Sequence, residues 1–306
     1  MKGAAEGRMV NTVGVVMTTK IVAGLIENSQ VRGGLQEFPE NIDATNGLIE
    51  VPADSLCEFI CDAIASRVSA GSNIEAAGVA VPGYVHQGVL LDSPNLPQLK
   101  GAPVADNLRS SLHKRGIDVA VKVFNDADAA AAGIAATRGQ LDRQIRVWTV
   151  GNGIGFGRYP WTVGPWEGGH MVVTLDPKER YCGCGGLGHL EGILGHRAMR
   201  LRFLDMEPDE VFAAARHGDR RCREFVELAH RALAAATASQ IHLEGPGRFY
   251  YTGRDIQRLD ISLLKQYLYE MIKMSPFQSY TAEILPEDPA LAVIGAGVAA
   301  ALFDGC

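Results

Sequence analysis

The sequence has few cysteines, no long apolar run and no excess of basic residues, and each of these shortages excludes a class of protein. Six cysteines in 306 residues are too few for a disulfide-stabilised scaffold. No stretch reaches the roughly 18 apolar residues of a membrane span. The N-terminus also lacks the basic flank and apolar run of a signal peptide. We therefore expect a cytoplasmic protein without a membrane partner.

The charge balance argues against a nucleic-acid partner. The chain has 29 Lys and Arg against 35 Asp and Glu, a formal net charge of -6, and no basic run that would attract a phosphate backbone. The residues before the first expected strand are also too few for a helix-turn-helix. We expect no binding of nucleic acid.

The residues that are present indicate an α/β protein of two domains, because a chain of this length can bury two cores. Strand-like segments occur at 12–27 (as a hairpin), 76–85, 119–125, 147–157 and 249–255, and helical patterns at 55–68, 192–243 and 291–303. An alanine-rich helix follows Asn125 and Asp126, and Ser55 is the expected N-cap of the first helix. Ligands of such folds bind where strands meet helices.

A short segment contains four residues with the donor atoms of a metal site. His170, Cys182, Cys184 and His189 occur as H-x11-C-G-C-G-G-L-G-H. Zinc prefers four tetrahedral Cys and His ligands, and glycines let a short loop fold back around one ion. We predict a structural Zn²⁺ site. The alternative is a glycine-rich loop with two buried thiols and two incidental histidines.

Two motifs around these residues give the chain a family resemblance. E-G-G-H at 167–170 and C-G-C-G-G-x-G-x-x-E at 182–191 resemble the signature of the ROK family (repressor, open reading frame, kinase). The family pattern has Cys where this chain has His189, so His189 is a substitution among the ligands.

The resemblance implies a fold of two actin-like ATPase (ribonuclease H-like) lobes around a hinge cleft that binds the sugar. It places residues 1–116 and 290–306 in the N-terminal lobe, and residues 117–289, with the zinc loop, in the C-terminal lobe. It also implies a homodimer.

Further matches imply a sugar site. Segment 78–101 is similar to the family stretch whose Pro-Asn-Leu asparagine contacts the sugar, and segment 124–133 resembles E-N-D-x-N-A-A-A-x-G, whose Asp is the general base. The sugar-binding residues implied by the resemblance are Asn95, Asn125, Asp126, Glu167, His170 and Glu191.

Asp126 has the chemistry that this role requires. A sugar hydroxyl that attacks phosphorus must lose its proton, and a carboxylate at a strand end can accept it, which contributes about 10²–10⁴-fold to a rate. Asn-Asp before an alanine run is also a common start of a helix, so helix capping is the alternative explanation.

The phosphate-binding motifs depart from the family pattern. Where the pattern has D-x-G-G-T-K, residues 15–20 are V-V-M-T-T-K, with Val15 at the Asp position and Met17 and Thr18 at the two glycines. Valine offers no oxygen to magnesium, and added side chains hinder backbone amides from binding phosphate.

A second motif, G-T-G-I-G-x-G, is kept at 151–157 except that Asn152 replaces Thr, and a G-G-G run is reduced to Thr252-Gly253-Arg254. The candidate nucleotide-binding residues are Thr19, Lys20, Gly151, Asn152, Gly153 and Gly253.

Three functions fit these observations. The first is phosphorylation of a hexose or N-acetylhexosamine with ATP and Mg²⁺. The second is nucleotide-independent conversion of a sugar by a hydrolase, lyase or isomerase, with Asp126, Glu167 and Glu191 as its carboxylates. The third is sugar binding without catalysis.

Overall fold

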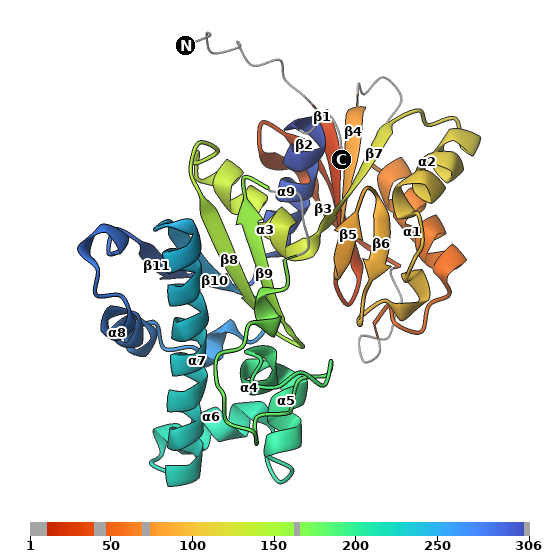
Figure 1. Ribbon diagram of the computed structural model, residues 1–306. Coiled ribbons are helices and arrows are strands. Elements are labelled where there is room, and N and C mark those ends of the chain that lie inside the picture. Colours follow the sequence, from red (N-terminus) through yellow and green to blue (C-terminus); the bar gives the residue numbers. More distant parts are fainter. Residues whose placement is uncertain (1–10, 40–46, 69–73, 162–165, 303–306) are drawn as a thin grey trace. The chain divides into compact units, whose positions relative to one another are not determined.

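The computed structural model describes residues 11–39, 47–68, 74–161 and 166–302 (Figure 1). Contacts within the chain divide it into two compact units. The first unit consists of Met1–Asp142, Gly157–Pro165 and Asp288–Cys306, and the second of Arg143–Phe156 and Trp166–Glu287. Each unit has its own sheet and its own apolar core, and each is described by itself below.

The first unit is built on a five-stranded sheet with the order β3-β2-β1-β4-β7. Its strands are β1 (Asn11–Met17), β2 (Ile21–Glu27), β3 (Gln30–Phe38), β4 (Ile74–Val81) and β7 (Ala120–Asn125). Strands β1 and β2 pair antiparallel, which confirms the hairpin predicted for 12–27. Strand β4 pairs parallel with both β1 and β7, so the carboxyl ends of these three strands lie at one edge of the sheet.

Alternating side chains of β1 divide the first unit into two cores. Val13 and Val15 belong to the larger core, which α1 (Ala53–Ala65) and α2 (Val104–Lys114) complete. Val16 belongs to a smaller core on the other face, with α3 (Asp126–Thr137) and α9 (Pro289–Leu302). A short hairpin, β5 (Tyr84–His86) and β6 (Val89–Asp92), follows β4.

Helix α9 approaches the sheet closely enough for backbones to touch. A Cβ atom at Gly14 of β1 would lie 1.8 Å from the carbonyl oxygen of Val293 in α9, and one at Gly78 of β4 would lie 1.9 Å from the carbonyl oxygen of Ala296. Glycine is therefore required at both contacts, because the obstructing atoms belong to the helix backbone.

The second unit contains a four-stranded sheet with the order β11-β10-β8-β9. Its strands are β8 (Ile145–Val150), β9 (Ile154–Tyr159), β10 (Arg248–Thr252) and β11 (Thr281–Ile284), and its helices are α4 (Glu191–Leu194), α5 (His196–Arg202), α6 (Pro208–Arg216), α7 (Arg220–Glu244) and α8 (Ile261–Met271). The core contains Trp148, Phe249 and Tyr251 from the strands and Leu233 from α7. Strand β10 runs parallel to both β8 and β11.

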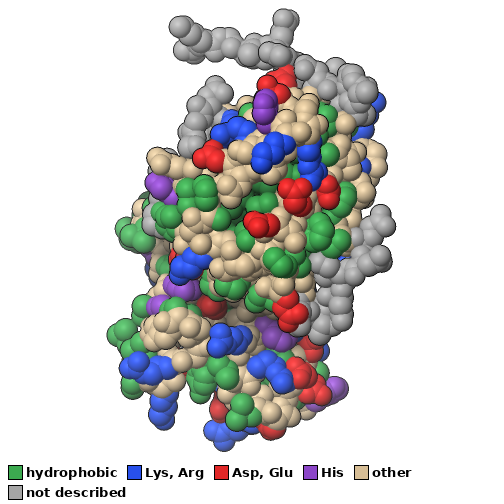
Figure 2. Space-filling view, turned by 90° about the vertical axis from the view of Figure 1, so that its right-hand side faces the viewer, with side chains coloured by type: hydrophobic (Ala, Val, Ile, Leu, Met, Phe, Trp, Pro, Cys, Tyr) green, Lys and Arg blue, Asp and Glu red, His purple; other side chains and the backbone are tan. Residues whose placement is uncertain are grey.

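Single 3-10 turns complete the described chain: η1 (Pro97–Leu99), η2 (Gly168–His170), η3 (Ile256–Arg258) and η4 (Ser275–Phe277). On the face drawn in Figure 2, acidic and basic side chains are interspersed, in keeping with the nearly balanced charges of the sequence. None of the described helices is both long and apolar enough to cross a membrane.

Two details differ from the sequence-based expectations. Helix α1 begins at Ala53 after Pro52, so Ser55 lies inside the helix and the prediction that it is the N-cap was wrong. Residues 117–142, expected in the C-terminal lobe, belong to the first unit, because β7 pairs with β4 and α3 packs on α9.

Replacing Gly14 with alanine should lower the free energy of unfolding by about 3 kcal/mol, the upper end of the cost of overpacking a core. The matched control is Gly24→Ala, because Gly24 is the cross-strand partner of Gly14. A Cβ atom at Gly24 would meet only side-chain atoms at 3.1–3.3 Å, which can shift, so about 1 kcal/mol is expected. Urea unfolding followed by circular dichroism measures the free energy of unfolding of both variants. An equal loss of stability in the two would contradict the close contact with α9.

Candidate functional site

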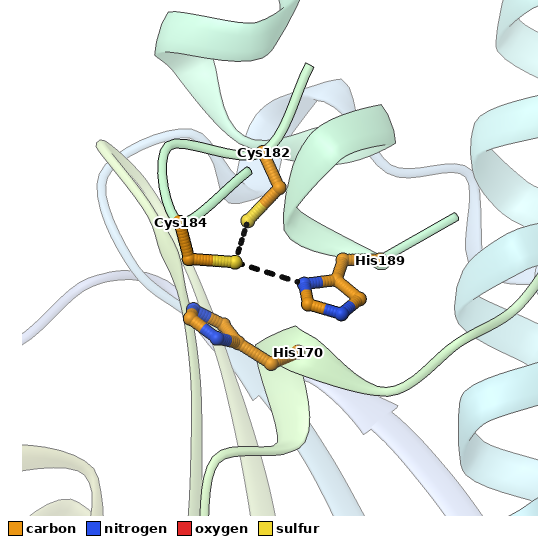
Figure 3. A group of neighbouring side chains, drawn as sticks. All are labelled: His170, Cys182, Cys184 and His189. Carbon is orange, nitrogen blue, oxygen red and sulfur yellow. Dashed lines mark hydrogen bonds between the residues drawn. The ribbon is translucent and has the colours of Figure 1, made fainter. Parts of the chain in front are cut away.

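The four predicted metal ligands lie together in the second unit (Figure 3). His170 ends η2, and the other three residues come from the loop that leads into α4. The Sγ atoms of Cys182 and Cys184 are 3.3 Å apart, and Sγ of Cys184 is 3.2 Å from Nδ1 of His189. All four ligand atoms lie within 4.8 Å of one another. We call these four residues the Cys/His cluster.

The Cys/His cluster has the size and the donors of a metal site. The ligand atoms of a tetrahedral zinc ion with two sulfurs and two nitrogens are about 3.3–3.8 Å apart. The distances in the cluster need to change by at most about 1.5 Å to reach these values. Two thiols and two imidazoles can therefore hold one metal ion.

Gly186 makes room for the imidazole of His189. A Cβ atom at position 186 would lie 2.1 Å from Cε1 of His189. The backbone of His189 is held by a β-bridge to Val172. A histidine therefore fits where the family pattern has the smaller cysteine.

Burial shifts the pKa values of two members of the Cys/His cluster, Cys182 and His189. It raises the pKa of the Cys182 thiol to about 12, and the carboxylate of Glu191 acts in the same direction. Burial and the nearby His170 lower the pKa of His189. In the metal-free chain the thiol is protonated and His189 is neutral at pH 7, so metal binding must release the thiol proton.

An ion pair supports the loop that carries the cluster. Both guanidinium nitrogens Nη1 and Nη2 of Arg202 bind the carboxylate of Glu179, with Nη1 at 2.9 Å from Oε1. The guanidinium also lies 4.4 Å from the ring centre of Tyr181. The backbone oxygen of Glu179 accepts a hydrogen bond from the backbone of Gly188. The residue that forms the ion pair is therefore also bonded to the far end of the loop that contains Cys182 and Cys184. Sequence reasoning missed this pair, because nothing in the spacing of the two residues marks them as partners.

Two of the predicted sugar-binding residues lie beside the Cys/His cluster. Oε1 of Glu191 is 3.9 Å from Nε2 of His170 and 3.8 Å from Sγ of Cys182. Oε2 accepts a hydrogen bond from the backbone of Ile154 at 3.1 Å. Glu167 is exposed at the start of η2, where its backbone oxygen accepts a hydrogen bond from His170.

His170, a sixth predicted sugar-binding residue, is itself a member of the Cys/His cluster. The remaining three belong to the first unit. Asn125 ends β7 and Asp126, half-buried, begins α3. The Asn125 side chain donates to the backbone oxygen of Gly83 at 2.9 Å. Ser93 donates to the backbone oxygen of Pro82 at 2.6 Å. The turn after β4 therefore connects Asn125 to the loop that presents the exposed Asn95 two residues after Ser93.

Asn125 also caps α3, as the structural alternative predicts. Its Oδ1 accepts hydrogen bonds from the backbone of Ala127 at 2.9 Å and Asp128 at 3.2 Å. Capping and sugar binding do not exclude each other, because an amide has two donors and two acceptor lone pairs. Asp128 has a structural contact, since its Oδ1 accepts a hydrogen bond from the backbone of Arg158 at 2.9 Å.

The turn after β1 does not resemble a phosphate-binding loop. Val15 and Met17 are fully buried in the larger core of the first unit. The backbone of Thr18 donates to the carbonyl of Lys20, and Nζ of Lys20 binds Oε2 of Glu37 at 2.5 Å. Thr19 is exposed. The turn nevertheless lies at the same sheet edge as the ends of β4 and β7.

The remaining candidate nucleotide-binding residues lie together in the second unit. Gly151, Asn152 and Gly153 connect β8 to β9, and Gly253 follows the parallel neighbour β10. Gly253 has φ +110°, and a Cβ atom there would lie 2.6 Å from the carbonyl oxygen of Val150. The two turns are thus in direct contact at the carboxyl edge of their strands.

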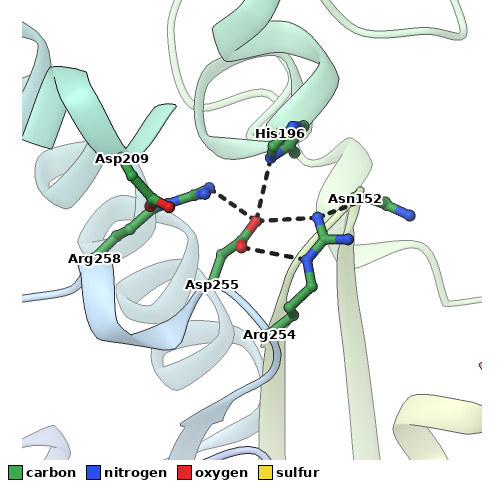
Figure 4. Close-up of polar contacts among 6 residues, drawn as sticks. All are labelled: Asn152, His196, Asp209, Arg254, Asp255 and Arg258. Carbon is green, nitrogen blue, oxygen red and sulfur yellow. Dashed lines mark hydrogen bonds and ion pairs between the residues drawn. The ribbon is translucent and has the colours of Figure 1, made fainter. Parts of the chain in front are cut away.

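A polar network next to these turns was not predicted (Figure 4). Nη2 of Arg254 donates to Oδ1 of Asn152 at 2.8 Å, and the buried Asp255 binds Arg258 at 2.8 Å. His196 lies 3.6 Å from Asp255. Arg258 also binds Asp209, whose pKa it lowers. The members come from separate segments of the sequence, so motif spacing could not reveal them.

Solved structures share this architecture. A ROK hexokinase from Thermus thermophilus superposes with a TM-score of 0.76 at 23% identity, covering 96% of this chain and 98% of that one. A ROK family glucokinase from Streptomyces griseus, in complex with glucose and AMPPNP, superposes with a TM-score of 0.69 at 23% identity, covering 96% and 100%. The fold is therefore the actin-like ATPase fold of ROK sugar kinases.

The sequence matches the ROK family model over residues 18–276, and the chain belongs to the ROK family. A glucokinase from Pyrobaculum calidifontis is 32% identical over 189 residues, which are 57% of this chain and 61% of that protein. A kanosamine kinase from Amycolatopsis mediterranei is 29% identical over 213 residues, 65% of this chain and 68% of that one. An N-acetylmannosamine kinase from Pasteurella multocida is 24% identical over 273 residues, 82% and 83%.

Asn125→Ala should lower the free energy of unfolding by about 1–2 kcal/mol, because it removes a helix cap and the bond to Gly83. Asn95→Ala is the matched control, since Asn95 is exposed, and its stability should change by less than about 0.5 kcal/mol. Thermal unfolding compares the two variants. If Asn125→Ala were as stable as the wild type, the cap would contribute nothing to the stability of the protein.

Proposed function

We propose that this protein phosphorylates a hexose or an N-acetylhexosamine with ATP. Membership of the ROK family supports the proposal, as do the kinases among its relatives. The observation that carries it is the position of Asn125 and Asp126 at the carboxyl edge of the first sheet, next to the turns after β1 and β4. Three strand ends meet there around one carboxylate, the usual place for a ligand in an open α/β sheet.

Asp126 acts as the general base in this proposal. Its carboxylate accepts the proton of the sugar hydroxyl as that oxygen attacks the terminal phosphorus of ATP. The bond from phosphorus to the β,γ-bridging oxygen breaks, and ADP leaves. Because such transfers depend mainly on positioning and charge neutralisation, the rigid support of Asn125 by Gly83 and α3 fixes the base next to its substrate.

The candidate sugar-binding residues are Asn95 and Asn125 in the first unit and Glu167, His170 and Glu191 in the second. Asn and Glu suit this task, because an amide both donates and accepts while a carboxylate accepts from two hydroxyls. His170 has two ring nitrogens, so it can bind a metal with one and hydrogen-bond with the other.

ATP brings Mg²⁺ to kinase reactions, where the ion neutralises phosphate charge. The buried Val15 does not fit the role of a magnesium-organising carboxylate. We assign no protein ligand of Mg²⁺ and no step to this position. The candidate nucleotide contacts are Thr19 and Lys20 in the first unit, and Gly151, Asn152, Gly153 and Gly253 in the second.

Asp126→Asn should reduce kcat by about 10²–10⁴-fold with little change in the KM for sugar, because the amide cannot accept the proton. A coupled assay for ADP across a panel of hexoses and N-acetylhexosamines measures this. Asp106→Asn is the control, since Asp106 is an exposed residue of α2 paired with Arg109. Sugar conversion by the wild type without ATP would contradict the kinase and indicate a nucleotide-independent enzyme instead.

We also propose that the Cys/His cluster binds a structural Zn²⁺ ion. The donors and their separations suit zinc, and four protein ligands leave no open position for chemistry. The metal would hold the loop on which His170 and Glu191 depend for their positions.

The purified protein should contain about one zinc ion per chain, and Cys184→Ser should lose it and unfold at a lower temperature. Cys57→Ser, a half-buried thiol of α1 outside the cluster, should retain the metal. Elemental analysis by mass spectrometry measures the zinc content. Equal zinc in both variants would disprove the assignment.

A homodimer in the cytoplasm completes the proposal. The described cysteines Cys57, Cys61, Cys182, Cys184 and Cys222 are all free thiols, which suits a reducing compartment. Light scattering after size-exclusion chromatography measures the assembly state.

A further inference from the structure

Two residues at which this chain departs from the ROK pattern are bonded to each other. Asn152 stands where the pattern has Thr, and Arg254 stands where it has Gly. In the structure, Nη2 of Arg254 donates a 2.8 Å hydrogen bond to Oδ1 of Asn152 (Figure 4). The two residues are 102 positions apart in the sequence, so the fold alone brings them together.

The bond joins two glycine turns, one of which has open space beside Gly151. Apart from Gly151 itself and its two chain neighbours, no described residue has a heavy atom within 4 Å of the position that a Cβ atom of Gly151 would occupy. The turn of Gly253 packs directly on Val150 at the end of the neighbouring strand. Arg254 therefore extends from one turn across to the other, beside an open stretch of backbone.

The guanidinium of Arg254 is held in place and still has donors to offer. Nε and Nη2 lie 3.4 and 3.5 Å from the carboxylate of Asp255, and the side chain remains 47% exposed. Within the described part of the chain, Nη1 of Arg254 has no hydrogen-bond partner. An arginine with a fixed plane and free N–H groups suits phosphate oxygens, which it binds in pairs.

The carboxylate of Asp255 does not fully neutralise the positive charge of the Arg254 guanidinium. This carboxylate is 4% exposed and is shared with Arg258, whose Nη1 is closer, at 2.8 Å. Arg254 thus retains positive charge toward solvent. Lys20, the cation of the other candidate phosphate turn, is instead paired with Glu37 at 2.5 Å.

We propose that Arg254 binds the phosphate chain of the phosphoryl donor and that Asn152 positions it. This inference rests on the proposed kinase function. It assigns the charge contacts of the donor to the second unit, where the space beside Gly151 leaves room. The ligand chemistry is a chain of phosphates, which ATP and inorganic polyphosphate both carry.

The test measures donor binding separately from catalysis. Arg254→Ala should raise the KM for ATP about tenfold or more, the loss expected for one charge-assisted hydrogen bond, and leave the KM for sugar within about twofold. Calorimetry with inorganic tripolyphosphate should show the same loss of affinity. Arg254→Lys should be intermediate, because it keeps the charge without the paired donors. Arg220 is an exposed arginine paired with Glu224, and Arg220→Ala is the control. It should change neither the KM for ATP nor the affinity for tripolyphosphate.

The role of Asn152 follows from a double-mutant cycle. Asn152→Ala should raise the KM for ATP in the wild type but not in the Arg254→Ala background. Unchanged binding of both ATP and tripolyphosphate by Arg254→Ala would overturn the inference. Loss of ATP affinity with unchanged tripolyphosphate affinity would overturn it too, because the contact would then be to the nucleoside. If no sugar is phosphorylated, the kinase proposal fails, but the calorimetry still tests Arg254.

Discussion

The close contact of α9 with β1 and β4 is the constraint on which the first unit depends. Backbone meets backbone at Gly14 and Gly78, so a side chain at either position would push the helix away from these strands. The same strands pair with β2 and β7, and their common register brings the turn after β1, the turn after β4 and Asp126 to one edge. A packing contact far along the chain from Asp126 thereby determines which residues surround it.

The sequence was sufficient to predict the parts of the site that are local. The Cys/His cluster could be predicted because its members lie within 20 positions and have donors that few other functions need. Asn125 and Asp126 were proposed from their motif, which also predicted the cap of α3, but the motif could not show that Asn125 binds the backbone of Gly83. The network around Arg254 could not be predicted from the sequence, because ion pairs between distant segments depend on the tertiary fold.

The phosphate side of the protein shows how one motif can change its physical role. Val15 and Met17 are core residues, so hydrophobic packing now holds the end of β1 where the family pattern has an acidic residue and a glycine. The turn that follows is closed by its own backbone bond and by an ion pair of Lys20. The second unit keeps the glycines of residues 151–157 and has Arg254 in place of a glycine of the G-G-G run. In the proposed kinase, the contacts to phosphate would therefore be distributed differently from the family pattern.

His189 also has an electrostatic consequence for its neighbour Glu191. Two thiolates and two neutral imidazoles balance the charge of a divalent ion, so such a centre is neutral, whereas a third thiolate would make it an anion. Glu191 lies 3.8 Å from Cys182, close enough for that difference to act on its carboxylate. A neutral centre would place no further negative charge beside this carboxylate, which accepts a hydrogen bond from the backbone of Ile154. In the proposed zinc centre, the room that Gly186 leaves for an imidazole would therefore also limit the negative charge beside Glu191.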